Sequence, residues 1–196
     1  MFSIFLVAVS YLIGSVPVGV LVGRLFGFDP RAVGSGNIGM TNVARVAGRG
    51  AATITFAGDL LKGAIPALAA RAIAPGADTI VLVALAAFTG SIFSLFLRLK
   101  GGRGVATSLG IWLALAPIAT LIALAVFLIV LAITRIVSLG SICAAIAMPI
   151  LILAMDFPRS YVALVIVMAA LIVLRHRDNI SRLAGGVEPK LGNDPA

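Results

Sequence analysis

Long apolar stretches separated by short polar loops make up most of the chain, and each stretch predicts a membrane-spanning helix. A helix needs about 20 apolar residues to cross the hydrocarbon core of a bilayer. The first stretch is interrupted by Gly14-Ser15-Val16-Pro17, where we expect the helix to bend or unwind locally. The stretches cover residues 2–26, 51–74, 79–97, 105–134, 136–155 and 161–174.

The stretch over residues 105–134 can form one helix or two. As one helix it would be about 45 Å long at about 1.5 Å per residue, which exceeds a hydrocarbon core of roughly 30 Å. Pro117 divides it into two short helices. Two crossings here place twelve of the 15 Lys and Arg residues on one side of the membrane, as the positive-inside rule favours. We therefore predict an all-α integral membrane protein with seven transmembrane helices, its N-terminus outside and its C-terminus cytoplasmic.

The composition agrees with a membrane protein. Of the 196 residues, 61% are hydrophobic and 11% are charged, whereas a soluble domain carries roughly 25% charged residues. At this length we expect a single domain, residues 1–196, built as a helix bundle. The net charge of +8 would suggest nucleic acid as the partner of a soluble protein. Here the basic residues lie in short loops beside apolar stretches, which indicates cytoplasmic loops and anionic substrates and no nucleic acid.

A polar, glycine-rich cluster at residues 34–45 stands out in this apolar chain. Its glycines let the backbone adopt positive φ and let N–H groups converge on an anion. Its hydroxyl and amide groups add neutral donors, and its arginine adds a planar charged group suited to phosphate. We therefore predict a phosphate or carboxylate site; the alternative is a polar turn whose glycines serve only close packing. The residues concerned are Gly34, Ser35, Gly36, Asn37, Gly39, Thr41, Asn42 and Arg45.

Two further clusters repeat this chemistry. The loop at residues 98–104 is basic and glycine-rich, and the N-terminus of a helix that follows it would favour an anion. Residues 175–188 include His176, the only histidine of the chain. On a helical continuation of the last stretch, His176 and Asn179 would share a face, with Arg182 nearby. With seven spans all three clusters lie on the cytoplasmic side, which predicts a pocket for more than one anionic group.

Two charges, Asp59 and Lys62, lie inside the second apolar stretch. Their i, i+3 spacing lets them pair on one face of a helix. Charges inside a span usually face a bundle interior or a polar cavity. The alternative is a purely structural ion pair between helices.

The three clusters resemble the signature motifs of the bacterial acyl-phosphate:glycerol-3-phosphate acyltransferase family, the PlsY family. The resemblance implies a seven-span enzyme of the bacterial inner membrane with its active site at the cytoplasmic face. Such an enzyme transfers a fatty acyl group from acyl phosphate to the 1-hydroxyl of glycerol 3-phosphate. The products would be lysophosphatidic acid and phosphate, at the entry of phospholipid biosynthesis. The matching segments are Gly34 to Arg45, Lys100 to Thr107 and His176 to Leu183, with Gly14 to Pro17 and Asp59 to Gly63 as further similar segments.

The resemblance also implies which residues act. The family positions used around the substrates correspond to Ser35, Arg45, Arg103, His176 and Asn179. The expected phosphate cradles and substrate contacts correspond to Gly34, Gly36, Asn37, Gly39, Thr41, Asn42, Lys100, Gly101, Gly102, Gly104, Arg182 and Glu188. No metal or other cofactor is implied. The implied partners are the two substrates, membrane lipid and, by functional link, the soluble enzyme that makes acyl phosphate.

Three positions depart from the family pattern. Ser91 and Ser94 stand where the second motif usually has histidine and proline, and Arg103 stands where it usually has lysine. Arginine keeps the charge but changes the geometry, so donor preference or rate is expected to differ. The missing histidine at Ser91 argues that this position is not an indispensable base.

An acyl phosphate is already activated, so its reaction needs orientation and charge stabilisation more than a strong nucleophile. We expect Arg45, Lys100 and Arg103, with loop amides, to hold the phosphates. Ser35 and Asn179 would orient the reacting hydroxyl or carbonyl.

The proton acceptor is open between His176 and a phosphate oxygen of the substrate, and we favour the substrate. A covalent acyl-Ser35 route lacks a visible activating dyad. Two other classes of protein compete with the enzyme. A transporter of a phosphorylated solute would need an internal repeat or a polar path through the bilayer, and an assembly factor with basic inner loops would leave the three clusters unexplained.

Overall fold

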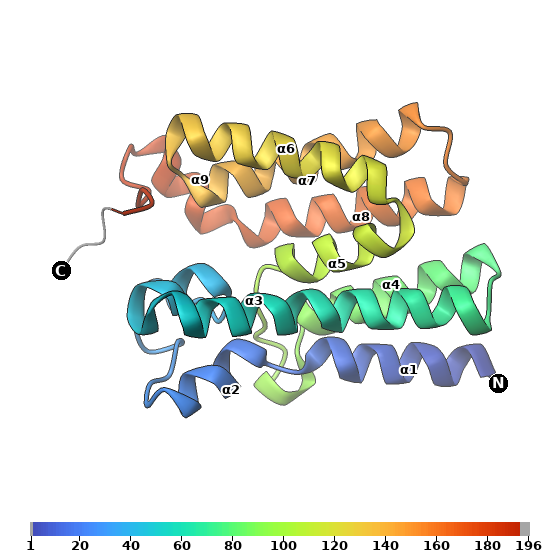
Figure 1. Ribbon diagram of the computed structural model, residues 1–196, viewed down its shortest axis with the longest axis horizontal. Coiled ribbons are helices and arrows are strands. Elements are labelled where there is room, and N and C mark those ends of the chain that lie inside the picture. Colours follow the sequence, from blue (N-terminus) through green and yellow to red (C-terminus); the bar gives the residue numbers. More distant parts are fainter. Residues whose placement is uncertain (1, 193–196) are drawn as a thin grey trace. The chain divides into compact units, whose positions relative to one another are not determined.

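Helices form all the regular structure of residues 2–192, the part of the chain that the computed structural model describes (Figure 1). This confirms the all-α prediction. The chain divides into two compact units between Leu115 and Ala116, and the single functional domain stays a prediction. The first unit contains α1 (Phe2–Ser15), α2 (Val18–Leu25), α3 (Met40–Ile73), α4 (Ala77–Ile92), the 3-10 helix η1 (Leu95–Leu97) and α5 (Val105–Leu115). The second contains α6 (Pro117–Thr134), α7 (Val137–Ala154), α8 (Arg159–Arg175) and α9 (Arg177–Ala184).

The first apolar stretch is broken where the sequence predicted a break. α1 ends at Ser15 and α2 begins at Val18. Pro17 has no N–H and therefore cannot continue the helical ladder. The N–H of Val18 instead turns back to the Val16 carbonyl oxygen at 3.0 Å.

Two helix pairs of the first unit meet through glycines. α1 lies along α4 at Gly14 and Gly90, and α3 lies along α5 at Gly63 and Gly110. At each of these positions a Cβ would overlap a backbone carbonyl oxygen of the facing helix. The absence of a side chain lets the backbones approach closely, as is common where lipid is the solvent and packing is the main source of association.

α3 begins at Met40, inside residues 27–50, which separate the first two apolar stretches and are predicted by the pattern to form a loop. The loop prediction is therefore wrong for residues 40–50, which are helical apart from Gly48. The helix is interrupted at Gly48, whose φ of 76° and ψ of −174° lie in a region that is essentially restricted to glycine. Gly48 makes a kink between a short polar helix and a long one.

The stretch over residues 105–134 contains two helices, with Pro117 at the start of α6. α5 has only 11 residues, which gives a length of about 16 Å. α4 ends at Ile92, before the predicted end of its span at Leu97, because the chain leaves the helix at Phe93.

The last apolar stretch does not continue as one helix. α8 ends at Arg175 and α9 starts at Arg177, with a bend of 56° between them. His176 lies at the bend, so the predicted helical continuation through this residue is wrong. α9 is a separate short helix.

Several segments are long and apolar enough to cross a membrane. Four qualify by length and composition alone: Phe2–Leu25, Ala77–Leu97, Pro117–Thr134 and Val137–Ala154. The bent pair α8 and α9 makes a fifth if it counts as one span. The part of α3 that follows Gly48 carries four charged residues, and α5 is short. The count of seven crossings and the orientation of the termini therefore stay predictions.

Candidate substrate site

The first polar loop comprises residues 26–39, which join α2 to α3. One buried side chain, Asn42 on the first turn of α3, holds this loop in place. Its Oδ1 accepts a hydrogen bond from the Ser35 N–H at 2.8 Å. Its Nδ2 donates to the carbonyl oxygens of Pro30 and Val33 at 2.8 and 3.1 Å. Asn42 is only 1% exposed, whereas Ser35 is exposed. The loop therefore presents Ser35 outward while Asn42 fixes its backbone from within.

The glycines of this loop have local reasons for their identity. Gly34 has a φ of 58° and passes so close to Asn42 that a Cβ would overlap its Oδ1. α3 begins after Gly39 without a side-chain cap, and the uncapped start of a helix favours an anion. Thr41 and Arg45 are one helical turn apart on this short helix. The anion site predicted for this loop and helix start stays a prediction.

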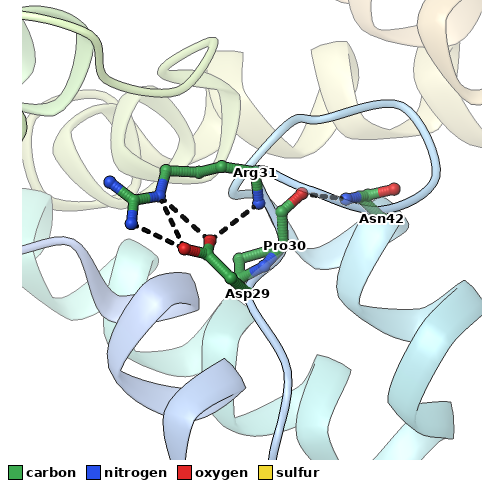
Figure 2. Close-up of polar contacts among 4 residues, drawn as sticks. All are labelled: Asp29, Pro30, Arg31 and Asn42. Atoms are coloured by element: carbon green, nitrogen blue, oxygen red, sulfur yellow. Dashed lines mark hydrogen bonds and ion pairs between the residues drawn. The ribbon is translucent and has the colours of Figure 1, made fainter.

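An exposed ion pair lies beside Pro30 in the same loop (Figure 2). The Arg31 guanidinium pairs with the Asp29 carboxylate at 2.6 Å, and the Arg31 N–H also donates to that carboxylate at 2.9 Å. These hydrogen bonds from Arg31 hold the pKa of Asp29 down to about 2. Figure 2 also shows the Asn42 amide reaching the Pro30 carbonyl from the other side. Both contacts shape the turn that leads to the glycines.

The second polar loop, residues 98–104, folds back onto the end of α4. The N–H groups of Gly101 and Gly102 donate to the carbonyl oxygens of Ile92 and Ser91, at 2.9 and 3.0 Å. A Cβ at Gly101 would overlap the Ser91 carbonyl oxygen. Close packing therefore explains Gly101, and these two N–H groups are engaged inside the loop. Any phosphate cradle formed here has to use other groups of the loop.

The two polar loops of the first unit lie against each other. A Cβ placed on Gly102 would be 3.5 Å from the Ile38 side chain and 3.8 Å from Oδ1 of Asn37. α5 begins directly after Gly104. The first unit thus brings together two glycine-rich loops and the starts of two helices. Three predicted cations belong to these elements: Arg45 and Arg103, both half-buried, and Lys100, which is exposed.

In the second unit, His176 and Asn179 are both buried, with 1% and 3% of their surface exposed. The Nδ1 of His176 lies 2.8 Å from the Ile172 carbonyl oxygen. Because a carbonyl only accepts hydrogen bonds, Nδ1 carries the hydrogen, and a neutral ring then has its lone pair on Nε2. The Oδ1 of Asn179 is buried and has no hydrogen-bond partner within residues 2–192. A buried acceptor of this kind is rare and suits a bound donor.

The Glu188 carboxylate accepts hydrogen bonds from three side chains of the second unit. Its Oε1 accepts hydrogen bonds from Ser138 at 2.7 Å and from the Nδ2 of Asn179 at 2.5 Å. Its Oε2 accepts from Arg182 at 2.7 Å. Burial acts to raise the pKa of Glu188, but the hydrogen bonds from the three side chains outweigh it, so the pKa lies below its ordinary value. The charged carboxylate therefore fixes the orientation of the Asn179 amide.

Sequence reasoning missed Ser138. It is one of two serines near the start of α7, with Ser141 one turn further on. Nothing in the apolar pattern distinguishes the serine that meets Glu188 from the one that bonds to its own helix at Val137. Only the return of the C-terminal segment to α7 reveals the difference.

The predicted site residues fall into two groups, one in each unit, and their roles stay predictions. The first group is Gly34, Ser35, Gly36, Asn37, Gly39, Thr41, Asn42, Arg45 and residues 100–104, and the second is His176, Asn179, Arg182 and Glu188. Apolar helices of membrane length, together with glycine-rich loops and buried polar side chains, are typical of a multi-pass membrane protein that carries a polar site.

Comparison with known proteins identifies the family. A family profile described as glycerol-3-phosphate acyltransferase matches residues 4–186. A glycerol-3-phosphate acyltransferase of Trichlorobacter lovleyi is 47% identical over 188 residues, which cover 96% of this chain and 97% of the relative. One of Thioalkalivibrio sulfidiphilus is 50% identical over 189 residues, covering 96% and 93%. The chain belongs to the glycerol-3-phosphate acyltransferase family. This confirms the resemblance seen in the three motifs.

Two solved structures are also similar. Both are crystal structures of PlsY (YgiH), an integral membrane glycerol 3-phosphate acyltransferase. Its glycerol 3-phosphate form matches with a TM-score of 0.94 and 40% identity, and its lysophosphatidic acid form with 0.92 and 39%. Each match covers 98% of this chain and 96% of the other. The protein is therefore a multi-pass integral membrane protein.

Proposed function

We propose that the protein transfers a fatty acyl group from acyl phosphate to the 1-hydroxyl of glycerol 3-phosphate. The products are lysophosphatidic acid and phosphate, for phospholipid biosynthesis. The reaction takes place at the cytoplasmic face of the bacterial inner membrane, which the chain crosses seven times. The acyl phosphate comes from the soluble enzyme that makes it.

The family match over residues 4–186 is the observation that carries this proposal. The similar PlsY structures represent a glycerol 3-phosphate form and a lysophosphatidic acid form. These two molecules differ by one acyl group on a glycerol hydroxyl, so acyl transfer relates them. Two glycine-rich, basic loops that lie against each other support acyl phosphate as the donor, because the reaction then has two phosphate groups to hold.

The charged and the neutral residues of the site have different roles in this proposal. Arg45, Lys100 and Arg103 hold the phosphates and reduce their mutual repulsion. Ser35 and Asn179 orient the reacting groups. The unpaired Oδ1 of Asn179 suits the acceptance of a hydrogen bond from the substrate hydroxyl, since Glu188 already holds the other end of the amide.

The transfer needs one bond formed and one broken. The 1-hydroxyl oxygen of glycerol 3-phosphate attacks the acyl carbonyl carbon, and the bond from that carbon to the phosphate oxygen breaks. Phosphate leaves with the electron pair, and the hydroxyl proton goes to a phosphate oxygen of the substrate or to Nε2 of His176. We favour the phosphate oxygen, because an acyl phosphate is activated enough to need positioning more than a strong base.

The test is phosphate release from palmitoyl phosphate by the purified protein in lipid, with and without glycerol 3-phosphate. Arg45→Ala should lower the rate by about 100-fold or more, which is typical for the loss of one charge-stabilising donor. Arg49→Ala is the matched control, because Arg49 lies four residues further on, beyond the kink at Gly48, and is exposed. It should keep the wild-type rate. Replacing palmitoyl phosphate by palmitoyl-CoA should abolish product formation.

Two results would contradict the proposal. Product formed from palmitoyl-CoA as readily as from palmitoyl phosphate would refute the proposal that acyl phosphate is the specific acyl donor. A wild-type protein that binds glycerol 3-phosphate, releases no phosphate and moves glycerol 3-phosphate into liposomes would favour the transporter.

A further inference from the structure

A buried ion pair on α3 has no part in the proposed reaction. Lys62 Nζ lies 2.8 Å from Asp59 Oδ1, and the two side chains are 8% and 15% exposed. Lys62 Nζ also donates a hydrogen bond to the Val16 carbonyl oxygen at 3.1 Å. Val16 belongs to the break between α1 and α2. The pair therefore ties the long part of α3 to an unwound segment of the first apolar stretch.

The segment that leads into the second polar loop is attached to the same break. Ser94 Oγ donates to the Ser15 carbonyl oxygen at 2.5 Å, and the Leu95 N–H donates to Ser15 Oγ at 3.4 Å. The Tyr11 hydroxyl donates to the Phe93 carbonyl oxygen at 2.7 Å. The start of the second loop is thus positioned by the end of α1.

The first polar loop depends on the other side of the break, through α2. A Cβ at Gly19 would overlap the Ile38 carbonyl oxygen. At Gly23 it would come within 2.8 Å of the Phe28 carbonyl oxygen and of Pro30. α2 therefore lies directly against the first loop, so the direction in which α2 leaves the break sets where that loop lies.

We propose that Lys62 is a positioning residue for substrate binding: by holding the Val16 carbonyl it fixes the break to which both polar loops are attached. This role rests on the proposed function of those loops. A displacement of the break would move both loops together, and with them Arg45 and Arg103. The consequence should be weaker binding of glycerol 3-phosphate as well as slower transfer.

The test is the double variant Asp59→Leu/Lys62→Met. Removing both charges avoids leaving a buried carboxylate without its partner. We expect kcat/KM for glycerol 3-phosphate to fall by about 10- to 100-fold, the range expected when reacting groups are displaced by up to about 1 Å. Most of this fall should come from a raised KM. A role in stability alone would lower the fraction of active enzyme and leave KM unchanged.

Two single variants serve as controls. Asp59→Asn keeps the lysine and its bond to Val16, so its KM should stay near the wild-type value, although the loss of the counter-charge of the buried Lys62 should lower stability. Arg71→Met is the matched cation removal, because Arg71 also lies on α3 and donates to a backbone carbonyl, that of Ala114 at the end of α5. It should lower thermal stability without raising KM.

A folded double variant with wild-type KM would overturn the proposal. If the double variant does not fold, Lys62→Arg takes its place, because arginine keeps the charge opposite Asp59 but changes the geometry at Val16. A raised KM in that variant supports the positioning role, and an unchanged KM refutes it. A wild-type protein without acyl transfer would refute the proposed function itself, and the positioning role with it.

Discussion

Asn42 contacts only the backbone of its own loop, through all three of its hydrogen bonds. Asn42→Ala leaves the Pro30 carbonyl oxygen and the Ser35 N–H without their partner, whereas the Val33 carbonyl oxygen still accepts from the Gly36 N–H at 3.1 Å. We therefore expect the free energy of unfolding to fall by about 1–3 kcal/mol. Thermal unfolding of the purified protein measures this change.

The companion variant is Ser35→Ala. It keeps the N–H that bonds to Asn42, so its stability should match the wild type even though the proposed catalytic hydroxyl is gone. An Asn42→Ala protein as stable as the wild type would show that the loop does not depend on this amide.

The roles of the two ring nitrogens of His176 can be tested separately. His176→Asn reaches only the position of Nδ1, keeps a donor towards the Ile172 carbonyl and removes Nε2. A general base contributes about 100- to 10,000-fold to a rate. We expect kcat to fall by less than this range, with an unchanged pH profile, because we favour the substrate phosphate as the base. A larger fall, together with loss of the acidic limb of the profile, would assign the proton to Nε2.

At the scale of elements, Glu188 joins α7, α9 and the C-terminal segment. Its pKa in the folded protein lies below the ordinary value of 4.5, so its stabilising effect is fully present above pH 4.5 and is lost as the pH falls through the lower folded pKa. Glu188→Gln should cost about 1–3 kcal/mol at neutral pH, because the amide cannot accept from all three partners. The two proteins should become similar in stability once the pH lies below the folded pKa of Glu188.

Thermal unfolding at a series of pH values measures this difference. Ser138→Ala is a milder comparison, since it removes one of the three donors. A constant difference between wild type and Glu188→Gln at every pH would contradict a charged carboxylate as the cause.

The kink in α3 depends on Gly48. Its conformation costs a residue with a side chain about 1–3 kcal/mol, so Gly48→Ala should lower stability by that amount. Gly50→Ala is the matched control, because Gly50 is helical, and a Cβ would meet nothing within 4 Å at either position. It should leave stability unchanged or raise it by up to about 1 kcal/mol. Equal effects of the two changes in thermal unfolding would mean that the kink is not strained.

Local chemistry explains which elements could be predicted from the sequence. Pro17 and Pro117 break helices through their own missing N–H, so both breaks were visible in the pattern. The early start of α3 was not visible in the pattern, because glycines such as Gly48 and Gly50 are also typical of a loop. The three polar clusters were visible from residue types alone.

The partners of the polar side chains could not be predicted. Asn42 and Lys62 bind backbone carbonyl oxygens, which every residue carries, so no residue type marks the acceptor. The contact of Ser138 with Glu188 joins residues 50 positions apart. Only the folded chain brings such groups together.

At the scale of the whole molecule, the number of crossings depends on α5. With 11 residues it is shorter than the roughly 30 Å hydrocarbon core, yet seven crossings require it to span. Single cysteines test this in a Cys143→Ala background, because Cys143 is the only native cysteine. With seven crossings, Gly76→Cys should react with an impermeant thiol reagent from outside, and Lys190→Cys only after permeabilisation.

A chain whose α5 does not cross would place the two cysteines differently. Lys190→Cys would then react from outside in intact cells, as Gly76→Cys does. That result would require a new assignment of sides for the second unit.

The glycine contacts between α1 and α4 and between α3 and α5 affect how a saturation mutagenesis map of this family should be interpreted. At Gly14, Gly63, Gly90 and Gly110 the nearest atom to an added Cβ would be a backbone carbonyl oxygen, so a smaller neighbouring side chain would not make room. These positions should be as intolerant of substitution as a reacting group. Intolerance at such a position marks helix packing, and only a functional assay on folded protein separates it from a role in chemistry.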